Sequence, residues 1–117
     1  RIAEALQLVI KQVVELMHLA GIEEAAQLNL CVSDGHHAVV TRYCSDVSTT
    51  ANSLYWHEGS EYTCTEGRCH MKDPDVDYGA ILVASEPLSN DQGWELVPNN
   101  HVVLIAEEVE VRALAIA

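Results

Sequence analysis

The chain has 117 residues, which is long enough to bury one hydrophobic core but not two. Its 18 acidic residues against 6 basic ones give a net charge of -12, which repels nucleic-acid phosphates and anionic membrane surfaces. No apolar run approaches the roughly 20 residues of a membrane-spanning helix, and no signal-peptide pattern marks the start. We therefore expect a cytoplasmic protein that binds neither nucleic acid nor membrane.

The first part of the chain predicts a helix and then a β-hairpin. Apolar residues recur every three or four positions over residues 2–20, including Val9 and Leu16, and Gly21 supplies a stop signal. Residues 28–43 contain two apolar runs on either side of Asp34-Gly35, a step typical of a two-residue hairpin turn. Apolar and mixed side chains alternate along the first run, which indicates a sheet with one face on the core.

The rest of the chain predicts a mostly antiparallel sheet joined by loops. The continuous apolar run over residues 80–84 is typical of a strand buried on both faces in the middle of a layered structure. Other strands are expected over residues 53–56, 102–106 and 109–114, with a further hairpin over residues 62–71. One helix and five or six strands indicate an α+β fold.

The four cysteines are Cys31, Cys44, Cys64 and Cys69. The chain is neither small enough nor secretory enough to require a disulfide framework, so we expect four reduced thiols.

Two metal sites are weaker alternatives. Soft ligands for zinc are available at Cys64, Cys69 and His70, with His36, His37 and Cys44. The Cys-x4-Cys spacing is at the outer limit for zinc ligands, and no second matching pair exists. The acidic run over residues 73–77 begins like a calcium loop, but Ala84 stands where the bidentate Glu belongs. We expect neither metal.

No other pattern marks an active site or a cofactor site. The cysteines and six histidines offer many nucleophile and base combinations, but no residue is placed to form an oxyanion hole. A glycine-rich phosphate loop is absent. The residues alone thus describe an acidic α+β chain without a self-evident site.

Five segments nevertheless occur, in this order, in a known family. They are residues 28–35 (LNLCVSDG), 40–43 (VTRY), 53–55 (SLY), 83–88 (VASEPL) and 94–100 (WELVPNN). They resemble the C-terminal half of class II glutamine amidotransferase domains. The closest subgroup is similar to the amidotransferase component of the fungal glutathione-degrading Dug complex. The last two segments, at their observed separation, make the resemblance specific.

The resemblance implies a fold and an activity. The fold is the αββα sandwich of N-terminal-nucleophile hydrolases, of which residues 1–117 would form a single partial domain. The activity is cleavage of a γ-glutamyl amide, in glutamine or a glutathione-type substrate, through a thioester on a cysteine at the extreme N-terminus. A peptidase subunit is an implied partner.

The resemblance assigns no catalytic residue to this chain. Arg1 stands at the start, and no internal cysteine has a free α-amino group to act as the base. Ser85 and Glu86 match a family motif and are the two candidates for substrate contact, although a structural role is favoured. Both ends of the chain resemble cuts, so we expect a fragment whose nucleophile half lies elsewhere. The alternative is a non-catalytic binding or scaffold module that retains the fold.

Overall fold

The computed structural model describes residues 1–59, 62–71 and 80–115, and these residues form two compact units. Unit 1 comprises Arg1–Asn52 and the C-terminal segment that begins at Pro98. Unit 2 comprises Ser53–Val97 and is therefore inserted, in the sequence, between the two parts of unit 1.

Unit 1 begins with the helix α1 (Ile2–Leu19), which confirms the predicted helix. Gly21 adopts a φ of 73°, a conformation that costs glycine little. Its N–H donates to the carbonyl of His18 (3.1 Å), and the next N–H, from Ile22, donates to Met17 (2.9 Å). These bonds satisfy carbonyls that would otherwise have no partner and end the helix.

The buried face of α1 differs from the predicted stripe. Ala3, Leu6 and Ile10 are buried, whereas Val9 and Leu16 are 46% and 65% exposed. The prediction that Val9 and Leu16 belong to the buried face is therefore wrong. Spacing alone does not choose between overlapping stripes on a helix that is apolar on several sides, and packing against the sheet makes the choice.

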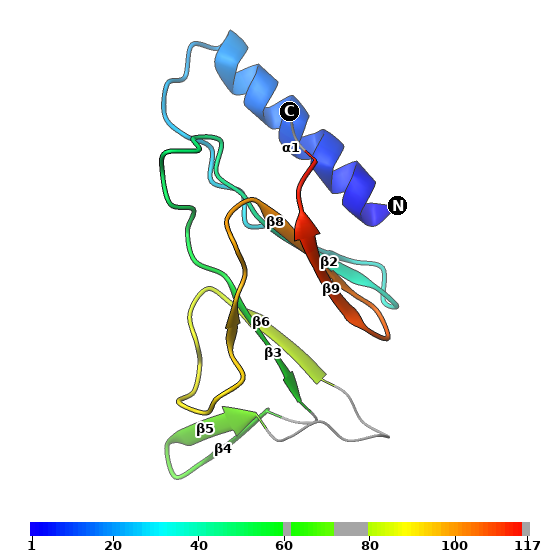
Figure 1. The fold of residues 1–117 in the computed structure, drawn as a ribbon, viewed down its shortest axis with the longest axis vertical. Coiled ribbons are helices and arrows are strands. Elements are labelled where there is room, and N and C mark those ends of the chain that lie inside the picture. The colour runs from blue at the N-terminus through cyan, green and yellow to red at the C-terminus, as the bar shows by residue number, and fades with distance from the viewer. Residues whose placement is uncertain (60–61, 72–79, 116–117) are drawn as a thin grey trace. The chain divides into compact units, whose positions relative to one another are not determined.

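The helix packs on a four-stranded antiparallel sheet with the strand order β1-β2-β8-β9 (Figure 1). The strands are β1 (Cys31–Ser33), β2 (Ala38–Arg42), β8 (His101–Ile105) and β9 (Val109–Ala113). Two predicted hairpins, β1-β2 and β8-β9, are thus confirmed. On the helix side of the sheet, Val39 and Val102 form a core cluster with Ala3 and Leu6.

The tip of the β1-β2 hairpin differs by one position from the predicted turn. Asp34 pairs with His37 through a backbone hydrogen bond of 3.1 Å, so the two residues at the tip are Gly35 and His36. The Asp34 carboxylate accepts hydrogen bonds from the backbone N–H groups of His36 and His37, and these bonds lower the pKa of Asp34 to about 2. Asp34 therefore acts through its side chain, as aspartate often does in turns.

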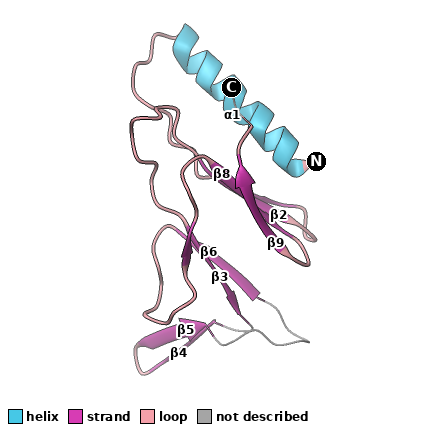
Figure 2. Cartoon of the chain, viewed as in Figure 1, coloured by secondary structure: helices cyan, strands magenta, loops and turns pink. Residues whose placement is uncertain are grey.

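Unit 2 contains a three-stranded antiparallel sheet and a separate hairpin (Figure 2). The sheet has the order β6 (Ala80–Ala84), β3 (Tyr55–Gly59), β7 (Glu95–Leu96). β6 lies at an edge of this sheet and is only half-buried, so the prediction of a strand buried on both faces is wrong. The apolar run fixed the strand correctly but not its position in the sheet.

The separate hairpin pairs β4 (Tyr62–Thr65) with β5 (Arg68–Met71), as predicted. Glu66 and Gly67 at its turn have φ angles of 53° and 78°. Two successive positive φ angles are typical of the tight turn that matches the twist of a two-residue hairpin.

The described residues confirm the α+β class, with one helix and mostly antiparallel strands. The αββα sandwich stays a prediction, as does the single partial domain over residues 1–117. No helix among the described residues is long and apolar enough to cross a membrane. The acidic run over residues 73–77 lies outside the described residues.

The two faces of α1 provide a matched test of this packing. We expect Leu6→Ala to lower the free energy of unfolding by about 2–5 kcal/mol, because Leu6 is 7% exposed and packs on the sheet. Leu16→Ala removes the same atoms from a side chain that is 65% exposed. It should change the free energy of unfolding by less than about 0.5 kcal/mol. Urea unfolding followed by circular dichroism measures both, and equal losses would contradict the observed packing.

Candidate functional site

The two substrate-contact candidates, Ser85 and Glu86, follow directly after β6, and both are exposed. The backbone carbonyl of Ser85 accepts a hydrogen bond of 2.8 Å from the hydroxyl of Ser53. This hydrogen bond gives the main chain of Ser85 a structural role. The role of either side chain in substrate binding stays a prediction.

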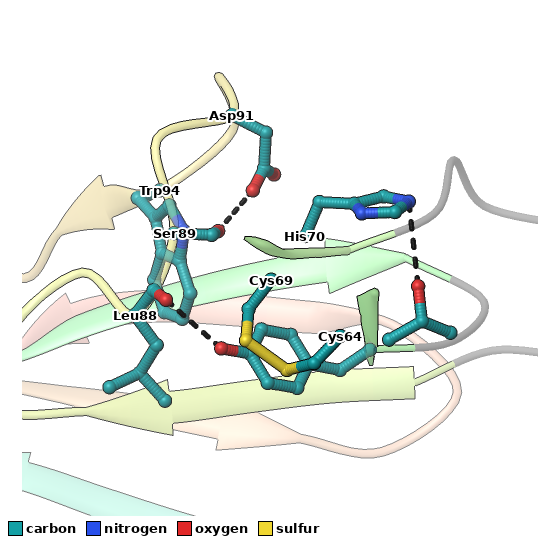
Figure 3. The surroundings of a disulfide bond; sticks show 9 residues. Cys64, Cys69, His70, Leu88, Ser89, Asp91 and Trp94 are labelled. Atoms are coloured by element: carbon teal, nitrogen blue, oxygen red, sulfur yellow. Dashed lines mark hydrogen bonds between the residues drawn. A yellow bond between two sulfur atoms is a disulfide. The ribbon is translucent and has the colours of Figure 1, made fainter. Parts of the chain in front are cut away.

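The residues that follow form a polar network within unit 2. Trp94 Nε1 donates to Ser89 Oγ (2.9 Å), and Ser89 Oγ donates in turn to Asp91 Oδ1 (Figure 3). The other carboxylate oxygen of Asp91 lies 2.6 Å from Nε2 of His57 on β3. A loop and a strand that are 34 residues apart are therefore joined by one carboxylate.

His57 is the buried end of this network, with an exposed fraction of 6%. Its Nδ1 lies 3.0 Å from the carbonyl oxygen of Glu58, and its Nε2 also lies 3.1 Å from the carbonyl oxygen of Gln92. The rings of His57 and Trp94 meet edge to face, with 5.1 Å between their centroids. The polar partners of the ring are all oxygen atoms, with one beside Nδ1 and two beside Nε2.

The pKa of Asp91 is lowered from its ordinary value of 3.8. The hydrogen bond from Ser89 contributes most, and the hydrogen bond and charge of His57 act in the same direction. Burial opposes them by disfavouring the charged form. The carboxylate is therefore ionised at neutral pH.

Gly93 lets the loop approach His57 closely. A Cβ atom at this position would lie 2.8 Å from both Cε1 and Nε2 of the imidazole, and Gly93 has a φ of 116°. Both the space and the backbone conformation thus require glycine here.

The network positions the loop rather than activating a nucleophile. In a nucleophile and base pair, the hydroxyl donates to the imidazole, which then removes its proton. Here Ser89 and His57 contact different oxygens of Asp91 instead. The arrangement fixes residues 89–94 against β3, next to the exposed candidates Ser85 and Glu86.

No local pattern in the sequence marked His57, Ser89 or Asp91. The only available signal was their neighbourhood, because Ser89 and Asp91 lie between the two segments that carried the family resemblance. The partner on β3 could not be found from spacing, since the contact depends on how a strand and a loop 34 residues apart are arranged.

Beside this loop lies the β4-β5 hairpin, and its cysteines correct the expectation of four free thiols. Cys64 and Cys69 form a disulfide (Figure 3), whereas Cys31 and Cys44 are free. The two half-cystines are direct cross-strand partners, and such a position places sulfur atoms within bonding reach. A cavity of about 710 Å³ lies against the hairpin, lined by residues 67–70 and 87–91.

The structure also bears on the zinc alternative. The disulfide occupies the sulfurs of Cys64 and Cys69, and His70 faces away from them because neighbouring residues on a strand point to opposite sides. His70 instead lies beside Thr63, with 3.4 Å between Nε2 and Oγ1. The other proposed ligands, His36, His37 and Cys44, belong to unit 1 rather than unit 2. Within the described ranges, no three such ligands are placed to hold a metal ion.

The chain is similar in sequence to a protein described as a probable glutamine amidotransferase, and no protein-family model matches it. The relative is probable glutamine amidotransferase DUG3 of Saccharomyces cerevisiae, with 36% identity over 87 residues. The match covers 73% of this chain but only 24% of the relative, so the chain spans about a quarter of that protein. This similarity supports a glutamine amidotransferase-like relationship.

Asp91→Asn tests the ionised state of the network. Because the folded pKa of Asp91 is lowered, its contribution to stability is complete above about pH 3.8 and is lost as the pH falls through the lowered value. We therefore expect wild type to be more stable than the variant at neutral pH, and this difference to shrink in acid. Urea midpoints measured from neutral to acidic pH give the difference, and a constant difference would contradict the lowered pKa of Asp91.

Gly93→Ala tests the close approach of the loop to His57. We expect the free energy of unfolding to fall by about 2–4 kcal/mol, because the new methyl group adds a steric clash to the cost of a positive φ. Gly35→Ala is the matched control, since Gly35 has a φ of 92° but open space around it, and should cost only about 1–2 kcal/mol. Thermal unfolding ranks the two variants, and a larger loss at Gly35 would refute the role assigned to Gly93.

Proposed function

We propose that this chain is part of a glutamine amidotransferase-like hydrolase that cleaves a γ-glutamyl amide through a cysteinyl thioester. The similarity to a glutamine amidotransferase over 87 residues carries the proposal. In the proposed reaction a cysteine thiolate attacks the γ-carbonyl carbon and the amine leaves. Water then attacks the thioester and releases glutamate. Glutamine or a glutathione-type peptide is the proposed substrate, and the proposed compartment is the cytoplasm.

The states of the four cysteines support a nucleophile that lies outside this chain. Cys64 and Cys69 are joined in a disulfide, and Cys44 is only 2% exposed, so none of the three presents a free thiol to a substrate. Cys31 is exposed, but its nitrogen is part of a peptide bond and cannot act as an α-amino base. The proposed nucleophile is therefore the N-terminal cysteine of the parent protein.

This chain would then supply scaffold to the parent enzyme. The His57 and Asp91 network holds the loop that follows Ser85 and Glu86, and this placement suits a wall of a substrate site. A peptidase subunit is the proposed partner of the parent protein. The second candidate function is a non-catalytic scaffold module, favoured by the same lack of an available nucleophile in the described residues.

Glutamate release separates these functions. The 117-residue chain alone should not hydrolyse glutamine or glutathione above a Cys31→Ser control, because it lacks the proposed nucleophile. The natural parent protein should release glutamate, and changing its proposed N-terminal cysteine to serine should abolish release. Turnover by the isolated chain would refute the assignment of the nucleophile. An inactive parent without an N-terminal cysteine would favour the scaffold module.

A further inference from the structure

The Cys64–Cys69 disulfide is a short-range cross-link within one hairpin. The two cysteines are only five residues apart, and the stabilisation that a disulfide provides through loop closure increases with loop length. The tight turn at Glu66 and Gly67 already sets the register that brings Cys64 opposite Cys69. The two sulfurs would therefore remain neighbours after reduction, and the bond could form again without a search.

The disulfide is also accessible to a small reagent. Cys64 is exposed, and Cys69 lines the cavity of about 710 Å³ together with Arg68 and His70. Arg68 brings a positive charge to this cavity. Asp91 also lines it, and the Asp91 carboxylate contacts His57. The disulfide is thus exposed at Cys64 and borders an open, polar cavity at Cys69.

A hydrogen bond connects the hairpin to the candidate site. The hydroxyl of Tyr62, at the start of β4, donates to the backbone carbonyl of Leu88 at 3.0 Å (Figure 3). Leu88 directly precedes Ser89, which is bonded to both Asp91 and Trp94. A two-stranded hairpin by itself is only marginally stable in water, so the cross-link helps to hold Tyr62 in place.

We propose that Cys64 and Cys69 form a reversible thiol–disulfide exchange site for small thiols, and that its redox state controls how firmly the hairpin holds residues 88–94. In the first step a small thiolate attacks the sulfur of Cys64, the more exposed residue of the pair. A mixed disulfide forms, the Cys64–Cys69 bond breaks, and Cys69 leaves as a thiolate that takes a proton from water. A second small thiolate then attacks the small-molecule sulfur of the mixed disulfide. A small-molecule disulfide forms, the bond to Cys64 breaks, and Cys64 leaves as a thiolate that takes a proton from water. The small thiols are oxidised by two electrons, and the protein disulfide is reduced by two.

Alkylation of the folded chain tests the exchange. The Cys31→Ser variant removes the exposed free thiol, and buried Cys44 serves as an internal unreactive control. Without reductant, iodoacetamide should leave Cys64 and Cys69 unmodified. After dithiothreitol treatment without denaturant, intact mass should show two added groups. In a reduced sample that is freed of dithiothreitol and not alkylated, the disulfide of 2-mercaptoethanol should restore the bond. Labelling of the pair without reductant, reduction only under unfolding conditions, or failure to restore the bond would each overturn the proposal.

Variants that keep one cysteine of the pair, together with buried Cys44, test the direction of attack. In the Cys31→Ser background, Cys69→Ser leaves Cys64 as the exposed thiol, and Cys64→Ser leaves Cys69 in the cavity. With the disulfide of 2-mercaptoethanol as probe, the exposed Cys64 should form the mixed disulfide several-fold faster. An equal or reversed order would overturn attack at Cys64.

Tryptophan fluorescence tests the connection to the loop. In a Trp56→Phe background, Trp94 alone reports on the network through its bond to Ser89. We expect reduction to shift the emission of Trp94. Tyr62→Phe is the matched control, because it removes the hydroxyl that contacts Leu88 and leaves both cysteines unchanged. Emission that does not respond to reduction, or that responds equally in the Tyr62→Phe variant, would overturn the coupling.

Discussion

Unit 1 depends on the antiparallel pairing of β2 with β8. The two strands match along their full lengths, from Ala38 opposite Ile105 to Arg42 opposite His101. This pairing places β2 and β8 at the centre of the sheet and joins the two parts of unit 1. It also aligns Val39 and Val102 on the side that receives α1. Both outer strands and the helix are thus added to a central pair whose members lie about 60 residues apart in the chain.

Much of this fold could be predicted from local patterns, because the physics behind it is local. The helix and its end at Gly21 follow from apolar spacing and a left-handed glycine, and three hairpins follow from turn residues between apolar runs. The failures concern relationships between elements. The apolar run of β6 indicated a strand but could not reveal that the strand lies at an edge. Likewise, spacing did not show which of the overlapping stripes on α1 would meet the sheet.

In the candidate site, too, local patterns did not predict contacts between separate elements. Ser85 and Glu86 were found through family resemblance, and their exposure leaves a substrate role to be tested. The network behind them escaped prediction, because the carboxylate of Asp91 joins Ser89, two residues away, to His57 on another element. The disulfide was missed for a different reason. Composition and expected compartment argued for reduced thiols, whereas the register of β4 and β5 places Cys64 directly opposite Cys69.

The insertion of unit 2 has a consequence for the order of folding. The backbone N–H of Val97 donates to the carbonyl of Leu54 at 2.9 Å, so the two ends of unit 2 are hydrogen-bonded to each other. Closing a long flexible loop costs entropy and slows the formation of distant strand pairs. If unit 2 forms early, the hydrogen bond between its two ends shortens the effective connection between β2 and β8. The inserted unit would then accelerate assembly of the sheet that it interrupts.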